Sequence, residues 1–220
     1  MLAKRRGSKN LRLSILPNGR VRVGLPAWAP YAAGIKFAQN RAGWISQHLE
    51  QHQPAILRDG SLIGKSYRLQ FVAIPSATKT SARLSGNNIT ITSHLHSSHQ
   101  AVQTKAAQAC ERALKKEAEK LLIYRLKELA GRHGFGYRQS KVMRLASRWG
   151  SCSNQKDITL NYYLVQLPWH LIDYVILHEL VHTQHLDHSP AFWARFAEIL
   201  PDVKTLKKEI RQYRPVLLPS

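Results

Sequence analysis

Apolar and polar residues alternate in the first part of the chain and follow helical spacing in the second. The stretch LRLSILPNGRVRVGLP alternates on both sides of a Pro-Asn-Gly turn, which predicts two strands, over about residues 11–16 and 20–25. Residues 31–50 carry apolar side chains at helical spacing and predict one helix, which must end before Pro54. Two further hairpins are predicted in the segments RDGSLIGKSYRLQFV and ARLSGNNITIT, the second with a turn at Gly86, Asn87 and Asn88.

Helical patterns dominate after residue 98. Residues 98–132 are rich in Ala, Lys, Glu and Leu and contain an apolar row, which predicts a long helix that ends near Gly131 or Gly134. The segments KVMRLASRWGSC and DITLNYYL predict strands that pair across the SNQK turn. Three helices should follow, from Pro168, from Ser189 and over about residues 202–213. This order of strands and helices predicts an α+β fold.

No linker separates the two kinds of pattern. We expect a β-rich N-terminal region over residues 1–95 and a helical region with a small sheet over residues 96–220, or one compact unit that includes both. The N-terminus has no signal-peptide core, and no apolar run is long enough to span a membrane. Cys110 and Cys152 have no C-x-x-C spacing, so we expect a reduced cytoplasmic protein without cysteine ligation of a metal.

The charge of the chain is strongly positive. Lysine and arginine number 33 against 13 acidic residues, which gives a formal net charge of +20 and a pI near 10.4. Such an excess favours polyanionic partners, such as nucleic acid, nucleotides or an anionic membrane surface. The alternative is a highly soluble basic protein whose charge has no bearing on its function, because the basic residues are spread along the chain.

The segment HELVHTQHLDHSPAFW, residues 178–193, changes the picture because it combines histidines with an acidic residue. His178 and His182 stand four residues apart with Glu179 after the first, which is the H-E-x-x-H pattern. On a helix, both imidazoles lie on one face and can point at one ion. The segment LIDYVILHELV is apolar on nearly all sides, and a buried helix rarely carries such polar groups without partners. The pattern therefore predicts a metal site in a cleft.

A catalytic zinc ion usually takes three protein ligands and one water molecule, so a third ligand is needed. If the helix continued, His185 would share the face of the first two histidines. Three histidines in a row along about 10.5 Å of helix axis cannot surround one ion tetrahedrally. Ser189 and Pro190 predict a new helix, before which the chain must turn back. We therefore favour His188 as the third metal ligand, at the spacing found in metzincin proteases. His185 is a second candidate, which would contact the metal ligands or the substrate.

Glu179 is rotated by about 100° from His178 around the helix axis, so we expect it not to bind the metal. It would hold a zinc-activated water molecule, accept its proton as the general base and return the proton to the leaving amine. Three other histidines, in the segment HLHSSH, lack an acidic partner and are better interpreted as a polar connector into the long helix.

Several of these segments are similar to the YgjP-like metallopeptidases, which are related to the SprT-like proteases. The matching stretches are SRWGSCS, ITLNYYL, DYVILHELVH, HSPAFW and, nearer the N-terminus, PNGRVRVGLP, AGWISQHL and DGSLIGKSYRLQF. The resemblance covers most of the chain. It implies a zincin-like core of a small sheet and an active-site helix, one zinc ion held by His178, His182 and His188, and Glu179 as the catalytic acid-base residue. Activity toward nucleoside triphosphates has also been proposed for this family.

The stretch RWGSC is a hallmark of the same family and contains a further candidate. Arg148 could place a cation near a carboxylate or phosphate of the substrate, or it could pair within the fold at the edge of a strand. We expect Trp149 and Cys152 to lie in the core. Asn161 could hold the end of a strand or the backbone of a substrate.

Three functions fit these observations. We favour a zinc-dependent metallohydrolase that cleaves peptides or proteins. The second hypothesis is a metal-dependent nucleoside triphosphate pyrophosphohydrolase, which the basic charge suits although no phosphate-binding glycine loop is present. The third is a DNA-associated protein with a structural metal. The predicted site has only three protein ligands, whereas structural zinc sites are closed by four, and this difference argues against the third hypothesis.

Overall fold

The structure, a computed structural model, describes residues 1–15, 21–51 and 56–216. It divides into two compact units, residues 1–55 and 56–220. The boundary that we expected at residue 95 falls inside the second unit, between a sheet and the long helix on which that sheet packs. Helices and several small sheets are mixed along the chain, so the α+β class is confirmed.

The first unit contains a three-stranded sheet and two helices. Its elements are β1 (Leu2–Arg5), β2 (Arg12–Ile15), β3 (Val21–Pro26), α1 (Tyr31–Gln39) and α2 (Ala42–Gln51). The strand order is β1-β3-β2, with β1 parallel and β2 antiparallel to β3. The predicted pair of strands is confirmed, but its turn at residues 16–20 and Pro54 lie outside the described residues.

The single helix expected over residues 31–50 is wrong, because two helices meet near Asn40. The amide of Asn40 still bonds to the carbonyl of Lys36, but the amide of Arg41 bonds to the carbonyl of Ala38. This tighter hydrogen bond ends α1 at Gln39, and two residues separate it from α2, which begins at Ala42. Helix α1 approaches the sheet closely at Gly34, where a Cβ atom would lie 2.8 Å from the Leu25 side chain.

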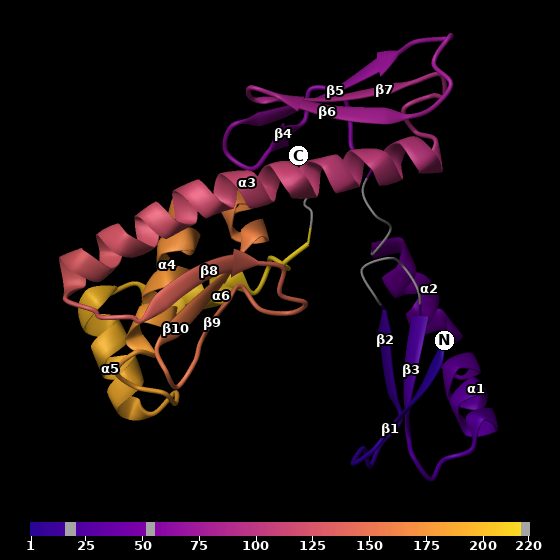
Figure 1. The fold of residues 1–220 in the computed structure, drawn as a ribbon. Helices are drawn as coiled ribbons and strands as arrows, with labels where there is room; N and C mark the ends of the chain where they lie inside the picture. Colours follow the sequence, from indigo (N-terminus) through magenta and orange to yellow (C-terminus); the bar gives the residue numbers. More distant parts are fainter. Residues whose placement is uncertain (16–20, 52–55, 217–220) are drawn as a thin grey trace. The chain divides into compact units, whose positions relative to one another are not determined.

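The second unit begins with a four-stranded sheet that packs on a long helix, α3 (Figure 1). The strands are β4 (Leu62–Ile63), β5 (Tyr67–Ala73), β6 (Ser81–Ser85) and β7 (Asn88–Ser93), in the order β4-β5-β7-β6. Both predicted hairpins are confirmed, since β4 pairs antiparallel with β5 and β6 pairs antiparallel with β7. The turn of the second hairpin is shorter than expected, because Asn88 already belongs to β7.

Helix α3 (Gln100–His133) matches the long helix predicted from the sequence. His99 caps its N-terminus by accepting a hydrogen bond from the amide of Ala101, so one of the HLHSSH histidines caps the helix. Gly134 ends the helix with a φ of +70°, a left-handed conformation that glycine adopts without strain. Within the described residues, no helix has both the length and the apolar character that a bilayer crossing requires.

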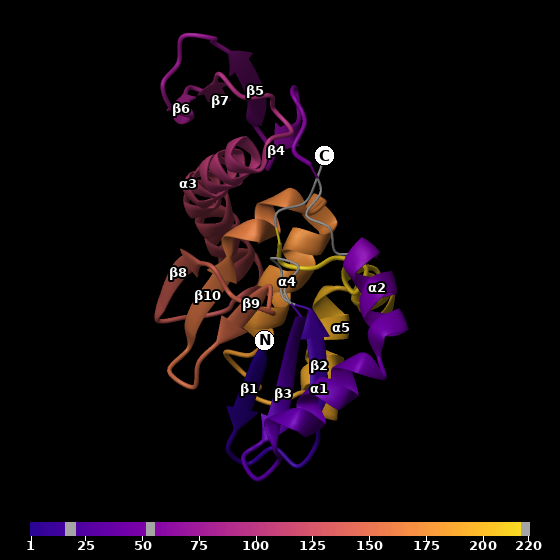
Figure 2. The same cartoon turned by 90° about the vertical axis from the view of Figure 1, so that its right-hand side faces the viewer.

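The remaining elements follow the C-terminal end of α3 (Figures 1 and 2). They are β8 (Gln139–Met143), β9 (Gly150–Cys152), β10 (Asp157–Asn161), a 3-10 helix (Tyr162–Gln166), α4 (Trp169–Val181), α5 (Pro190–Ile199) and α6 (Val203–Ile210). The expected pairing across the SNQK turn is confirmed for β9 and β10, which are antiparallel. The segment before β9 is not one strand, because residues 144–149 form a loop and β8 pairs parallel with β10.

Helix α4 lies in the core of the second unit, as its apolar sequence predicts. The side chains of Ile172, Ile176 and Leu180 are fully buried, and they lie on the side of the helix away from its histidines. The contacts of α4 with α3, α5, α6 and β9 fix the position of this helix. A rigid helix of this kind is a suitable support for functional side chains.

Candidate metal centre

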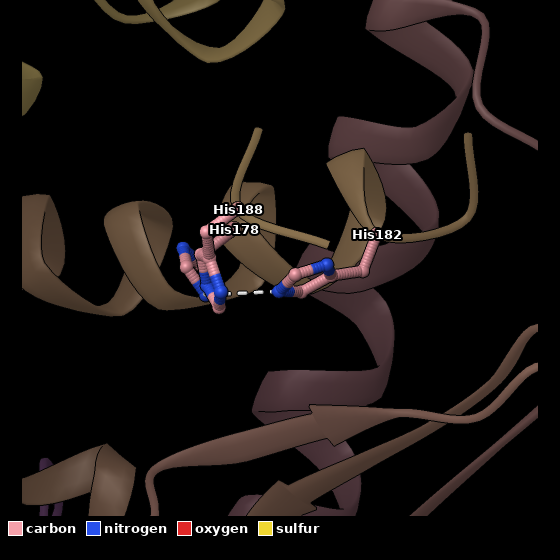
Figure 3. Close-up of side chains that lie close together, drawn as sticks. All are labelled: His178, His182 and His188. Carbon is pink, nitrogen blue, oxygen red and sulfur yellow. Dashed lines mark hydrogen bonds between the residues drawn. The ribbon is translucent and has the colours of Figure 1, made fainter. Parts of the chain in front are cut away.

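Three histidines converge at the end of α4. The Nε2 atom of His178 lies 3.2 Å from Nε2 of His182 and 3.1 Å from Nε2 of His188. The candidate ligand atoms of the three residues all lie within 4.8 Å of one another, and Figure 3 shows the rings pointing toward one another. Among the described residues, no other group of histidine, cysteine and acidic side chains has this arrangement.

The turn after α4 brings His188 back to the helix. The amides of Thr183 and Gln184 bond to carbonyl groups three residues earlier, which ends the helix in a tight turn. The Asp187 side chain then accepts a hydrogen bond from the amide of Ser189, and Pro190 occupies the first turn of α5. The restart of the helix that the sequence predicts is therefore present, and it places His188 beside the first two histidines.

Hydrogen bonding and burial hold the imidazoles of His178 and His182 in the neutral state that a metal requires. Nδ1 of His182 donates to the carbonyl of His185 at 2.9 Å, so its Nε2 atom keeps a free lone pair. Burial, together with the smaller effects of the neighbouring His182 and His188, lowers the pKa of His178 to about 3, so this ring is neutral near pH 7. Its Nδ1 atom is buried with no hydrogen-bond partner among the described residues.

Aromatic packing orients His178, since no hydrogen bond does so at Nδ1. The ring of Phe192 lies against all three histidines, with centroid distances of 5.0 Å to His178, 4.6 Å to His182 and 4.9 Å to His188. Trp193 stacks on His188, and the ammonium group of Lys207 lies 3.8 Å from the centre of the Trp193 ring. Helix α5 therefore covers the histidines with apolar side chains.

Glu179 lies next to the histidines and is only 5% exposed. Burial raises the pKa of its carboxyl group, the charge of Arg148 lowers it by a smaller amount, and the net result is a pKa of about 8. Gly150 of β9 packs directly against it, because a Cβ atom at this position would lie 2.7 Å from Cγ and 2.8 Å from Oε1 of Glu179. The absence of a side chain at Gly150 thus leaves the space that the carboxylate occupies.

A cavity of about 570 Å³ opens over this group of residues. The three histidines and Glu179 line it together with Arg148 and the strand β9. Trp149 and Cys152 also line it and are half-buried, so our expectation that both lie in the core is wrong in part. The His185 side chain does not line the cavity, and this residue meets the histidines only through its backbone carbonyl.

The family model for the YgjP-like metallopeptidase domain matches residues 9–213 of this sequence. The chain belongs to the YgjP-like metallopeptidase family. It is therefore a hydrolase of the peptidase type, and the resemblance noted from the sequence is confirmed. Comparison with curated proteins gives no significant match.

Two solved structures show partial similarity to this YgjP-like chain. The metallopeptidase zymogen of Pyrococcus abyssi abylysin has a TM-score of 0.39 and 20% identity, over 42% of this chain and 93% of that one. The metallopeptidase zymogen of Methanocaldococcus jannaschii jannalysin has a TM-score of 0.38 and 21% identity, over 42% of this chain and 96% of that one. The family assignment rests on the sequence match alone.

Asn161 organises the loop that precedes β9 in this YgjP-like protein, a role that the sequence analysis left open. Its side-chain amide donates to the carbonyl groups of Leu145 and Arg148, both at 2.8 Å, and its oxygen accepts from the amide of Tyr163. The side chain is fully buried, so these bonds are shielded from water. Asn161 thereby fixes the loop on which Arg148 and Gly150 depend.

Proposed function

We propose that this metallopeptidase is zinc-dependent, with His178, His182 and His188 as the metal ligands and Glu179 as the general base. The observation that carries the proposal is the convergence of three imidazole nitrogens beside a buried carboxylate, at the wall of a cavity. A surface cluster of histidines would lack both the buried acid and the adjoining cavity.

The geometry of the histidines fits a tetrahedral zinc ion. Zinc–nitrogen bonds of about 2.0–2.1 Å at tetrahedral angles separate two ligand nitrogens by about 3.3 Å. The separations of 3.1 and 3.2 Å from Nε2 of His178 are close to that value. A site with three imidazoles suits zinc, and three protein ligands leave one position open toward the cavity.

The bound metal and Glu179 would have different roles in peptide hydrolysis. When bound, the zinc ion would polarise both a water molecule and the carbonyl group of the substrate. The Glu179 carboxylate would accept the proton of the water and then deliver it to the leaving nitrogen of the cleaved bond. A carboxyl pKa raised by burial favours this exchange, since a base near neutral pKa both accepts and releases a proton readily.

Strand β9 and Arg148 are the groups that we propose for substrate binding. In the order β8-β10-β9, β9 is the last strand, and its outer edge has no strand partner among the described residues. An extended peptide could pair with this edge and pass Glu179, which packs on Gly150. Arg148 is exposed at the cavity and forms no ion pair with a described residue, so its guanidinium group can bind a carboxylate of the substrate.

Metal analysis combined with hydrolysis assays on two variants tests the proposal. Glu179→Gln should retain zinc and lose at least 100-fold in casein hydrolysis, because the amide cannot accept a proton. His188→Ala should lose both zinc and activity. The exposed Glu119 of α3 provides a matched control, since Glu119→Gln removes the same charge far from the metal site in sequence and should change neither property.

The same preparations distinguish the nucleotide hypothesis from the peptidase proposal. Nucleoside triphosphates replace casein, with release of pyrophosphate as the measurement. Activity on nucleotides alone would assign the site to phosphohydrolysis, and full casein activity in Glu179→Gln would show that another group serves as the base.

A further inference from the structure

The sheet of the first unit has two different faces. On one face, the apolar side chains of Val23 and Leu25 pack toward α1. The register places Arg12 beside Gly24 and Arg22 beside Ser14, on the opposite face. Arg5 belongs to the same opposite face, because it lies two residues after Ala3, the partner of Gly24 in β1. Arg5, Arg12 and Arg22 come from three different strands and together define the arginine face.

The residues between these arginines are small. Ala3, Ser14 and Gly24 lie on the same face, and a Cβ atom at Gly24 would meet only backbone and Cβ atoms of Arg12, at 3.7 and 4.0 Å. With a strand spacing of about 4.8 Å and a rise of about 3.3 Å per residue, the Cα atoms of Arg12 lie about 8 Å from Arg22 and about 12 Å from Arg5. A flexible chain of anions can therefore approach the sheet and meet several guanidinium groups in succession.

The positive charge of this unit is not neutralised internally. Residues 1–55 contain three lysines and six arginines against one acidic residue, Glu50. None of the three arginines forms an ion pair with a described residue; Arg5 and Arg12 are exposed, whereas Arg22 is half-buried and its buried Nε atom has no hydrogen-bond partner among the described residues. By contrast, Arg125 and Arg138 of the second unit each pair with a carboxylate through two nitrogens.

We propose that the arginine face binds the sugar–phosphate backbone of nucleic acid. Guanidinium groups bind phosphate through two parallel hydrogen bonds, and a nucleic-acid strand repeats that anion at regular intervals. A sheet face with small residues between cations on three strands fits such a repeating ligand better than a single small anion, which would need a closed pocket. The proposal is independent of the metal site, since all of its residues belong to the first unit.

Binding of a fluorescent single-stranded oligonucleotide to the full chain tests this proposal. The variant replaces all three arginines by glutamine. Each phosphate contact to a single strand contributes about 0.7 to the slope of log K against log salt, so loss of three contacts should lower the slope by about 2 and the affinity at 0.1 M salt by about 100-fold. Zinc content and casein hydrolysis should be unchanged, which separates this test from that of the metal site.

A second variant controls for charge alone. Lys116, Lys120 and Lys127 are exposed on α3, and their replacement by glutamine removes the same three charges from the second unit. If this variant loses as much affinity as the first, net charge rather than the arginine face causes binding, and the proposal is wrong. The proposal would also be wrong if the triple arginine variant lost binding to phosphatidylserine vesicles but kept its affinity for the oligonucleotide. That result would indicate a membrane surface as the partner.

Discussion

Replacement of Gly150 by alanine would place a methyl group in the space that Glu179 occupies. The new Cβ atom would lie 2.7 Å from Cγ and 2.8 Å from Oε1 of Glu179, well inside ordinary contact distance. Gly150 is not in the left-handed region, so an alanine backbone fits there and the strain falls on the glutamate. A displacement of about 1 Å of a catalytic group lowers kcat by about 100-fold, equivalent to about 2.7 kcal/mol. Overpacking should also lower the free energy of unfolding by about 1–3 kcal/mol.

Hydrolysis of casein at fixed zinc content measures this effect. Gly150→Ala should keep its zinc, because the three histidines lie on other elements, and should lose activity through kcat. Gly136→Ala is the matched control, since no heavy atom lies within 4 Å of a Cβ atom there and its φ is not positive. Unchanged kcat in Gly150→Ala, with a folded and zinc-loaded protein, would refute the idea that this glycine sets the position of Glu179.

Three further predictions concern stability and metal binding. Asn161→Ala should lower the free energy of unfolding by about 3 kcal/mol, because the carbonyl groups of Leu145 and Arg148 both lose the donor that the buried Asn161 side chain provides; denaturant titration measures this, and a change below about 1 kcal/mol would contradict it. In the metal-free chain, His178 should lower the free energy of unfolding by about 1.4 kcal/mol between pH 7.5 and 5.5, because the unfolded residue binds a proton near pH 6.5 whereas the folded residue, with a pKa of about 3, does not; the difference between the original chain and His178→Phe in denaturant titrations at the two pH values measures this contribution. An equal slope in His178→Phe would disprove that assignment. Phe192→Ala should lower stability by about 3–5 kcal/mol and weaken zinc retention against a chelator, because its ring packs on all three imidazoles; unaltered retention would show that the packing does not orient them.

The sequence predicted those parts of the site that depend on local spacing. The four-residue separation of His178 and His182 follows directly from helix geometry. His188 was favoured over His185 because Ser189 and Pro190 indicate a new helix, and the structure has this restart. The assignment of these residues as metal ligands stays a proposal, but their convergence was predictable from short-range patterns alone.

Features that depend on tertiary contacts were not predictable in the same way. The need for glycine at position 150 arises only when β9 meets α4, which are far apart in the sequence. Asn161 bonds to carbonyl groups of a loop more than ten residues earlier, and no pattern in the sequence marks that distance. Likewise, β8 and β10 pair in parallel, so the chain between them must return to the end of the sheet where β8 begins. The segment KVMRLASRWGSC, which we expected to form one strand, is therefore divided between β8 and β9.

The long helix α3 determines which part of the chain can be separated from the rest. Its N-terminal half buries Val102, Ala106 and Ala109 under the β4–β7 sheet, while its C-terminal half contacts the elements around the histidines. A fragment that began at the helix itself would expose half of an apolar surface to water. A fragment designed to contain the three histidines and Glu179 without the first unit should therefore begin at residue 56. It then keeps the β4–β7 sheet, which covers the apolar surface of α3.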